Sequence, residues 1–292
     1  MPCVGLNCEE KGKVRFEECL KCQNRCMSER TVRLFQKITS RLLTGKSITQ
    51  LLLPTRMLYL MMTRDYYEKP KVLIDRTIGW LAHQRIDWGQ REKQEEKTGI
   101  CDRIVITESK IVIHIRSNGL SKKKKKRKET GKKKTVKKRK TGILSEKHLE
   151  DSKRGMEGTI DTYDGDLYDV KVCGAYAAAK ALKGEVDLPW CIQLNYYRIL
   201  LESHGYPVRR MFIEPWVKDS ASIARRYGIS KKPNLIEINR ISDWWIDRWI
   251  RIKRDRLEQA LRSGKTMRCR RTWKGKRCAT CPVLEFCQEM EE

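Results

Sequence analysis

A short β-hairpin around residues 158–172 constrains this chain more than any other feature. Residues 158–161 and 167–172 are rich in β-branched side chains, and Asp164-Gly165-Asp166 between them has the composition of a turn. Strand side chains return to the same face every second residue, so Asp169 and Lys171 are expected to point the same way. Two carboxylates, counting Asp161 at the end of the first strand, and one ammonium are therefore predicted to meet on this hairpin.

This set of side chains has a specific chemistry. The carboxylates of Asp161 and Asp169 offer the hard oxygen ligands that Mg²⁺ and Mn²⁺ prefer. The nearby Lys171 ammonium can position or deprotonate a water molecule, or stabilise charge on a phosphate under attack. The hairpin thus has the outline of a metal-dependent nuclease site.

The net charge of the chain indicates a polyanionic partner. The 292 residues include 64 Lys and Arg against 37 Asp and Glu, a formal net charge of +27. Nucleic acid is the first candidate for such a charge, and an anionic membrane surface is the second. No run of eighteen apolar residues exists, and the first residues lack the order of a signal peptide. We therefore expect a soluble intracellular protein with no membrane partner.

Much of the charge lies in one segment, residues 121–141. Residues 122–140 hold fourteen Lys or Arg and one acid, without an aromatic residue. Such a run repels itself and cannot form a core, so a disordered insertion is expected. A solvated linker and an arm that contacts DNA phosphates non-specifically are equal alternatives for it, and a nuclear import signal is a third.

Nine of the twelve cysteines gather at the two ends of the chain. With no secretory signal, this grouping favours reduced thiolates that hold metal over disulfides. At the amino end, the two-residue interval between Cys19 and Cys22 predicts a small zinc knuckle, with partly free surface thiols as the alternative. Its predicted ligands are Cys8, Cys19, Cys22 and Cys26, with Cys3 nearby.

The carboxyl-terminal cysteines are packed more densely. Cys269, Cys278, Cys281 and Cys287 lie within nineteen residues, which indicates either a tetrahedral zinc site or a 4Fe-4S cluster, and spacing alone does not choose between them. The remaining three, Cys101, Cys173 and Cys191, are expected to be buried small hydrophobic residues.

Helices are predicted where apolar side chains recur at helical spacing. The expected helices are 29–43, 47–62, 72–88, 175–182, 192–203 and 241–262, and the further strands are 104–106, 111–115 and 208–214. Ser47 is the candidate cap of the second helix, which Pro54 bends or restarts. The apolar residues of the last helix are expected to be mostly core, although a tryptophan face could also stack bases: Trp244, Trp245, Ile246, Trp249, Ile250 and Ile252.

Two pairs of residues lie one helical turn apart. Gly79 and His83 share a face of the helix 72–88, and Gln193 and Tyr197 share a face of the helix 192–203. A lone helical histidine is usually a structural residue. Gly79 costs helix stability, which indicates close approach of another element.

In this order the motifs resemble the RecB-like branch of the PD-(D/E)xK nucleases, especially the CRISPR-associated (Cas) iron-sulfur exonucleases and their viral or transposon relatives. The matching pieces are Gly79-x-x-x-His83, Gly158-x-x-Asp161, Asp169-x-Lys171, Gln193-x-x-x-Tyr197 and the cysteine tail Cys278-x2-Cys281-x5-Cys287. The resemblance covers about residues 47–118 and 142–287.

The resemblance implies a role for each matching residue. His83, Asp161, Asp169 and the Val170 carbonyl would hold the Mg²⁺ or Mn²⁺ ion, which makes His83 a metal ligand rather than a structural residue. Lys171 would orient or activate the attacking water. Gln193 and Tyr197 would place the DNA strand and support Lys171. Relatives often degrade single-stranded DNA from an end, and some trim DNA before its insertion into a CRISPR array.

The chain departs from the family at two positions. Where relatives place the first cysteine of the cluster, this chain has Leu52-Leu53-Pro54-Thr55-Arg56, so Cys269 is the nearest candidate for the fourth ligand, in competition with the amino-terminal cysteines. The acid before Lys171 is Asp169 instead of the commoner glutamate, which the broader superfamily tolerates.

The sequence as a whole predicts an α/β, restriction-endonuclease-like core, a mixed sheet flanked by helices, with a cysteine-ligated metal centre. The expected segments are an amino-terminal knuckle (1–28), helical entry region (29–98), nuclease core with the basic insertion (99–264) and cysteine tail (265–292). The expected function is a metal-dependent single-stranded DNA exonuclease of a prokaryotic or viral cytoplasm, with a CRISPR integration complex as a candidate partner. A non-catalytic nucleic-acid-binding adaptor that keeps the fold is the alternative. A zinc-finger RNA-binding protein would leave the hairpin and Gln193-Tyr197 unexplained.

Overall fold

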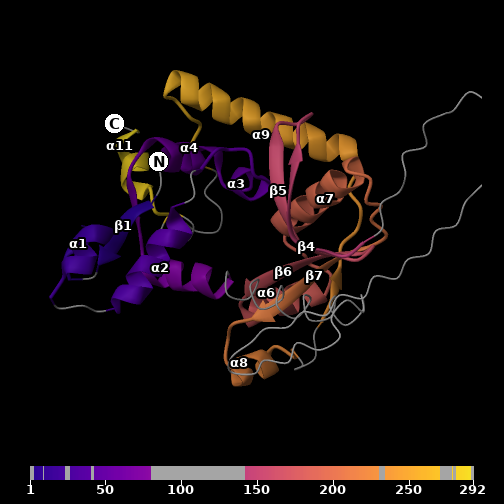
Figure 1. The fold of residues 1–292 in the computed structure, drawn as a ribbon, viewed down its shortest axis with the longest axis horizontal. Coiled ribbons are helices and arrows are strands. Elements are labelled where there is room, and N and C mark those ends of the chain that lie inside the picture. The colour runs from indigo at the N-terminus through magenta and orange to yellow at the C-terminus, as the bar shows by residue number, and fades with distance from the viewer. Residues whose placement is uncertain are drawn as a thin grey trace, which may run out of the picture.

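The computed structural model describes residues 3–8, 10–23, 27–40, 43–79, 142–229, 234–269, 278 and 281–290. Within them the chain is a mixed α/β protein with two mixed sheets flanked by helices, which confirms the predicted fold class at that level (Figure 1). Several predictions lie outside the described residues: Cys26, His83, Cys101, the second half of the helix 72–88, the strands 104–106 and 111–115, and the basic insertion 121–141.

The larger sheet carries the predicted hairpin at its centre. Its strands follow the order β4 (Leu144–Asp151), β5 (Met156–Tyr163), β6 (Leu167–Cys173), β7 (Met211–Val217) and β8 (Ile236–Glu237). Neighbours are antiparallel except β6 and β7, which are parallel. A parallel pair needs a long crossover, and here two helices between β6 and β7 supply it.

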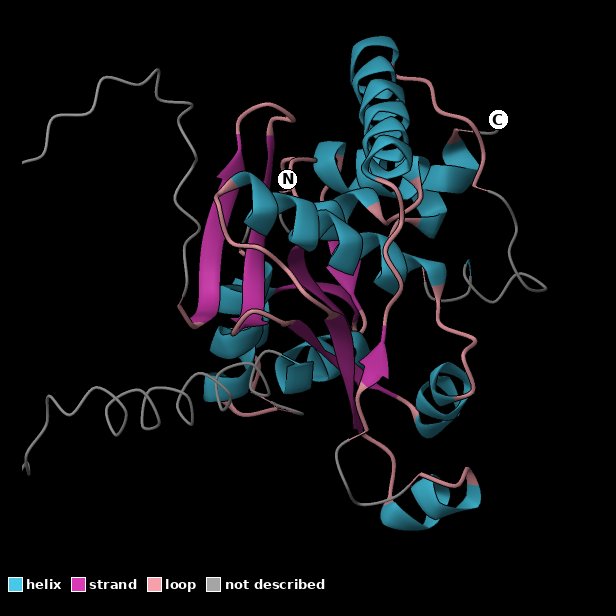
Figure 2. Cartoon of the chain, turned by 90° about the vertical axis from the view of Figure 1, so that its right-hand side faces the viewer, coloured by secondary structure: helices cyan, strands magenta, loops and turns pink. Residues whose placement is uncertain are grey.

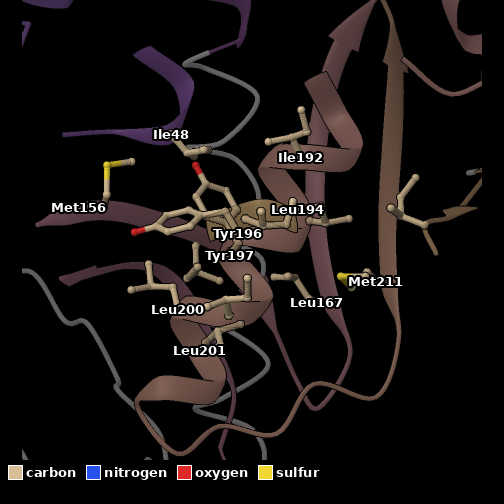
Figure 3. Packing of buried hydrophobic residues seen from close by; sticks show 14 of the residues in the cluster. Ile48, Met156, Leu167, Ile192, Leu194, Tyr196, Tyr197, Leu200, Leu201 and Met211 are labelled. Carbon is tan, nitrogen blue, oxygen red and sulfur yellow. The ribbon is translucent and has the colours of Figure 1, made fainter. Parts of the chain in front are cut away.

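These crossover helices are α6 (Ala175–Leu182) and α7 (Leu188–Ser203). Every residue of α7 from Ile192 to Leu201 is buried, so this helix is enclosed by protein on all sides. Figure 3 shows its apolar side chains packed with residues of β5, β6 and β7 and with Ile48; those labelled from α7 are Ile192, Leu194, Tyr196, Tyr197, Leu200 and Leu201. The helix is thereby fixed on the sheet beside the hairpin.

The longest helix, α9 (Asp243–Ser263), runs along the top of the molecule in Figure 1. Its first turn is capped by the Ser242 side chain, which accepts a hydrogen bond from the Trp245 N–H at 3.4 Å. It ends at Gly264, whose φ of +69° is the left-handed conformation that glycine adopts at little cost. Among the described residues, no helix has both the length and the apolar character needed to cross a membrane.

A second, smaller sheet belongs to the amino-terminal part of the chain. Its order is β2 (Gly12–Arg15), β1 (Cys3–Cys8) and β3 (Tyr66–Glu68), with β1 parallel to β3. Residues 70–79 are helical, and the other helices around this sheet are α1 (Phe16–Lys21), α2 (Glu29–Thr39), α4 (Thr55–Thr63) and α11 (Leu284–Glu289). Their shared core includes Leu6, Phe35, Leu73 and Val283, so the predicted segments 1–28, 29–98 and 265–292 pack together.

The two sheets are joined through the segment between α2 and α4. Leu43, Leu53 and Tyr59 pack against both cores. The N–H of Glu157 on β5 donates to the Lys46 carbonyl at 3.0 Å. Helix α4 packs along α9, and α9 also contacts α7, which lies on the larger sheet. Figure 2 shows the helices and strands of the chain from the side.

Several local predictions are confirmed and others are corrected. Pro54 separates α3 (Ile48–Leu51) from α4, as predicted, but the Ser47 hydroxyl bonds Thr49 and makes no capping bond. On α9, Ile246 and Ile250 are buried as expected of core residues, whereas Trp244 and Ile252 are exposed and do not belong to the core. Packing against α3, α4 and α7 covers part of the surface of this helix, so side chains on the rest of it reach water. Of the internal cysteines, Cys173 is buried and Cys191 is half-buried.

Candidate active site

The candidate site forms where β5 and β6 separate. The two strands pair only next to their turn, through Thr162 with Tyr168 and Tyr163 with Leu167. Further on, the N–H of Val170 donates to the Asp161 Oδ2 carboxylate oxygen at 2.9 Å instead of to a strand carbonyl. The N–H and C=O of a strand residue point to the same side, so the Val170 carbonyl also faces this opening.

Asp169 and Lys171 share one face of β6, as the two-residue strand period predicts. Their side chains form an ion pair with 2.6 Å between Lys171 Nζ and Asp169 Oδ2. Both carboxylates are largely buried, with 9% of Asp161 and 2% of Asp169 exposed. The Lys171 side chain is 19% exposed, so its ammonium reaches the edge of the site.

Gln193 on α7 links these groups. Its Oε1 accepts from Lys171 Nζ at 3.0 Å, and its Nε2 donates to Asp169 Oδ1 at 3.4 Å and to the Tyr197 hydroxyl at 3.1 Å. One amide therefore contacts the acid, the lysine and the tyrosine. The five side chains predicted from sequence converge: Asp161, Asp169, Lys171, Gln193 and Tyr197.

Tyr197 closes the inner end of this network. Burial raises the pKa of its phenol well above the usual value, and the negative charges of Asp169 and Asp161 raise it further, while the hydrogen bond from Gln193 opposes the shift. The hydroxyl therefore stays protonated at physiological pH. Its proton keeps a third negative charge away from the two carboxylates.

Gly158 allows α7 to come this close to β5. A Cβ atom at Gly158 would lie 2.9 Å from Cε1 of the Tyr197 ring and 3.1 Å from a Leu200 methyl. Any larger residue would push α7 away from the strand that carries Asp161. The glycine of the Gly158-x-x-Asp161 motif is thus required by packing.

The oxygen donors of this site fit a divalent cation. Asp161, Asp169 and the Val170 carbonyl surround the opening between β5 and β6, and carboxylate and carbonyl oxygens are ligands of Mg²⁺ and Mn²⁺. In the part of the chain that the structure describes, no three His, Cys, Asp or Glu side chains are grouped to hold one metal ion. The predicted further ligand, His83, lies outside that part.

The carboxyl-terminal cysteines gather beside α11. The pKa of Cys281 is raised by burial of its thiol and, to a lesser degree, by the charges of Cys269, Cys287 and Cys278, so these three thiols lie within electrostatic reach of Cys281. As placed in the described part of the chain, the four are not grouped to hold one metal ion. The Cys281 N–H donates to the Cys278 carbonyl, and Arg56 Nη2 donates to the Cys287 carbonyl at 2.5 Å. A cation bound at Cys281 would favour the deprotonated form of its thiol.

We expect anaerobically purified protein to carry a brown 4Fe-4S cluster on these four cysteines, because clustered thiolates bind iron or zinc tightly. Elemental analysis and visible absorption would show it, and Cys281→Ser should lose the metal. Cys191→Ser, at a half-buried cysteine away from the tail, is the control and should keep it. Colourless protein with stoichiometric zinc would contradict the iron-sulfur assignment, and protein with neither metal would contradict both.

The amino-terminal cysteines lie on β1, on α1 and at the end of α1. Cys3 is buried in β1 and its thiol donates to the Gly5 carbonyl, Cys8 ends β1, and Cys19 lies on α1. The Cys22 sulfur accepts a hydrogen bond from Lys11 Nζ. Cys26 lies outside the described residues, so zinc binding by Cys8, Cys19, Cys22 and Cys26 stays a prediction.

Comparison with known proteins adds no assignment. No protein-family model matches the chain, and a search of curated proteins found no match.

Proposed function

We propose that this chain is a metal-dependent DNA nuclease with a PD-(D/E)xK-type active site. One observation carries the proposal: Asp161, Asp169 and Lys171 meet where β5 and β6 separate, and Gln193 bonds both members of the Asp169–Lys171 pair. Two acids and a lysine at a partly open strand pair suit hydrolysis of a phosphodiester, because the reaction needs a held cation and a positioned water.

Asp161, Asp169 and the Val170 carbonyl would hold the Mg²⁺ or Mn²⁺ ion. When bound, the ion lowers the pKa of a coordinated water and neutralises charge on the scissile phosphate. The protein contributes a fixed and mostly buried set of oxygen donors. The backbone N–H of Val170 orients the Asp161 carboxylate.

Lys171 is the group that meets the water or the phosphate. An ammonium has three N–H donors, of which Asp169 and Gln193 take two. The third donor has no partner among the described residues, and the side chain is partly exposed. Lys171 can therefore donate to a phosphate oxygen or hold the attacking water.

Gln193 and Tyr197 act as positioning residues in this proposal. Both are nearly completely buried, with 6% and 5% exposed. Gln193 bonds Asp169 and Lys171 directly, whereas Tyr197 acts on them through Gln193. The amide of Gln193 has a fixed orientation because the protonated Tyr197 hydroxyl accepts from its Nε2. This chain of hydrogen bonds holds the Lys171 ammonium next to the Asp169 carboxylate.

The net charge of +27 supports a nucleic acid substrate. The sequence resemblance adds three points to this proposal. The substrate is single-stranded DNA attacked from an end, the setting is a prokaryotic or viral cytoplasm, and the partner is a CRISPR integration complex.

The proposal is tested by incubating end-labelled single-stranded DNA with the protein and Mn²⁺, Mg²⁺ or EDTA. Wild type should cleave with metal and not with EDTA, and Asp161→Asn should be inactive because the amide removes a metal-binding charge without changing shape. Asp164→Asn, at the exposed turn where the side chain only accepts from the Asp166 N–H, is the matched control and should stay active. Tight binding without cleavage in any metal would instead support the non-catalytic adaptor.

A further inference from the structure

A cavity of about 630 Å³ lies away from the candidate active site, where the start of α4 meets the second half of α9 and the segment after it. The five charged side chains that line it are all cationic: Arg56, Lys253, Arg256, Lys265 and Arg268. No aspartate or glutamate is among its described lining residues. Like charges gathered around one cavity repel one another, so an anionic ligand would relieve an energetic cost.

The neighbouring charges on α9 are arranged differently. Arg254 and Arg262 both form ion pairs with Glu258. Arg256 and Lys265, which line the cavity, form no ion pair with any residue that the structure describes. The charges of Arg256 and Lys265 are therefore not neutralised by an ion pair with a described acid.

The N-terminus of α4 adds hydrogen-bond donors. The nine-residue helix begins at Thr55 after Pro54, with no side-chain capping bond, and Pro54, Thr55 and Arg56 all line the cavity. First-turn N–H groups have no partner within a helix, and the helix dipole places positive charge there. The buried Oγ1 of Thr266, another lining residue, makes no hydrogen bond with a described residue. Phosphate oxygens would satisfy donors of both kinds.

We propose that this cavity binds phosphate groups of a single-stranded nucleic acid and holds the strand at a distance from the cleavage site. The identity of the strand rests on the proposed nuclease function, whereas the anion site rests on the cavity itself. The volume is within the usual range for ligand pockets, and the charges come from three segments, namely α4, α9 and the residues after α9. An extended cationic surface suits successive phosphates of a backbone.

The sequence did not indicate this cavity, because its side chains come from segments about 200 residues apart. Lys253, for example, donates a hydrogen bond to the Leu53 carbonyl. The one available signal was the spacing of Lys253 and Arg256, which places both on one face of α9.

The test compares two double variants of equal charge change. Arg256→Gln with Lys265→Gln removes two cavity cations, and Arg251→Gln with Lys183→Gln removes two exposed cations that do not line the cavity. Binding of a fluorescein-labelled oligothymidine of about 20 nucleotides is measured by anisotropy without divalent metal, over a range of salt concentrations. We expect the cavity variant to bind roughly tenfold more weakly, with a salt slope smaller by about 1.4, because each phosphate contact on single strands contributes about 0.7.

Equal weakening in both double variants, or unchanged binding in the cavity variant, would overturn the proposal. Competition with inorganic tripolyphosphate separates the two sources of phosphate. If the cavity variant lost tripolyphosphate binding but bound the oligonucleotide like wild type, the cavity would hold a free polyphosphate, and the strand assignment would be wrong. Because binding is measured without cleavage, this result is independent of the Asp161→Asn assay.

Discussion

Replacing Lys171 by alanine is expected to lower the rate of DNA cleavage by about 10²- to 10⁴-fold, the range typical of a lost proton-transfer or water-positioning group. The ammonium is held between Asp169 and Gln193, and the Lys171 side chain is partly exposed to solvent. Its remaining N–H donor is therefore available to the water or the phosphate. Removing it leaves both metal-binding carboxylates in place. The measurement is single-turnover cleavage of end-labelled single-stranded DNA at saturating Mn²⁺.

The Lys171→Ala variant is compared with a control variant and by its affinity for DNA. Lys147→Ala removes an exposed lysine of β4 and should leave the rate unchanged. DNA affinity should be nearly the same in the Lys171→Ala variant, because one partly buried lysine contributes little to a net charge of +27. Cleavage at the wild-type rate would remove Lys171 from the mechanism, and loss of binding together with cleavage would make its role electrostatic attraction.

Replacing Gly158 by valine should destabilise the protein by about 1–3 kcal/mol, as overpacking of a well-packed core does. Valine has a higher strand propensity than glycine, so the sequence alone would favour the change. In the structure even the first carbon of the side chain would lie 2.9 Å from the Tyr197 ring. The denaturant midpoint should fall. The cleavage rate of the folded protein should also fall, because Tyr197 and Gln193 would move with α7.

The matched control is Gly142→Val. Nothing lies within 4 Å of a Cβ atom at Gly142, so its effect should be within about 0.5 kcal/mol. A second arm combines Gly158→Val with Tyr197→Ala, which removes the ring that the new side chain meets. If the clash is the cause, the double variant should lose less stability than the sum of the two single changes. Additive losses would show that Gly158 matters for another reason.

The sequence predicted the local elements of the site because they depend on short-range periods. A two-residue repeat placed Asp169 and Lys171 on one face of a strand, and a four-residue interval placed Gln193 and Tyr197 on one face of a helix. The structure has both arrangements. Patterns of this kind are read within ten residues of chain, where backbone geometry alone fixes the side-chain directions.

Strands without such a pattern were not predicted. β4, with the sequence Leu-Ser-Glu-Lys-His-Leu-Glu-Asp, is an edge strand in which only Leu149 and Asp151 are buried. Its strand conformation comes from pairing along β5 rather than from its own composition. In the same way β1, whose cysteines indicated a zinc knuckle, is a strand because β2 and the distant β3 pair with it.

The sequence by itself determined the hairpin, the glutamine-tyrosine helix and the strong positive charge. Only the tertiary structure decided that Gln193 bonds both Asp169 and Lys171, that Gly158 must be small, and that Arg56 and Arg256 line one cavity. It also decided that the two ends of the chain share a core around Leu6 and Val283. The physical reason is that these contacts join residues far apart in the chain, and their geometry depends on how buried surfaces pack rather than on any local repeat.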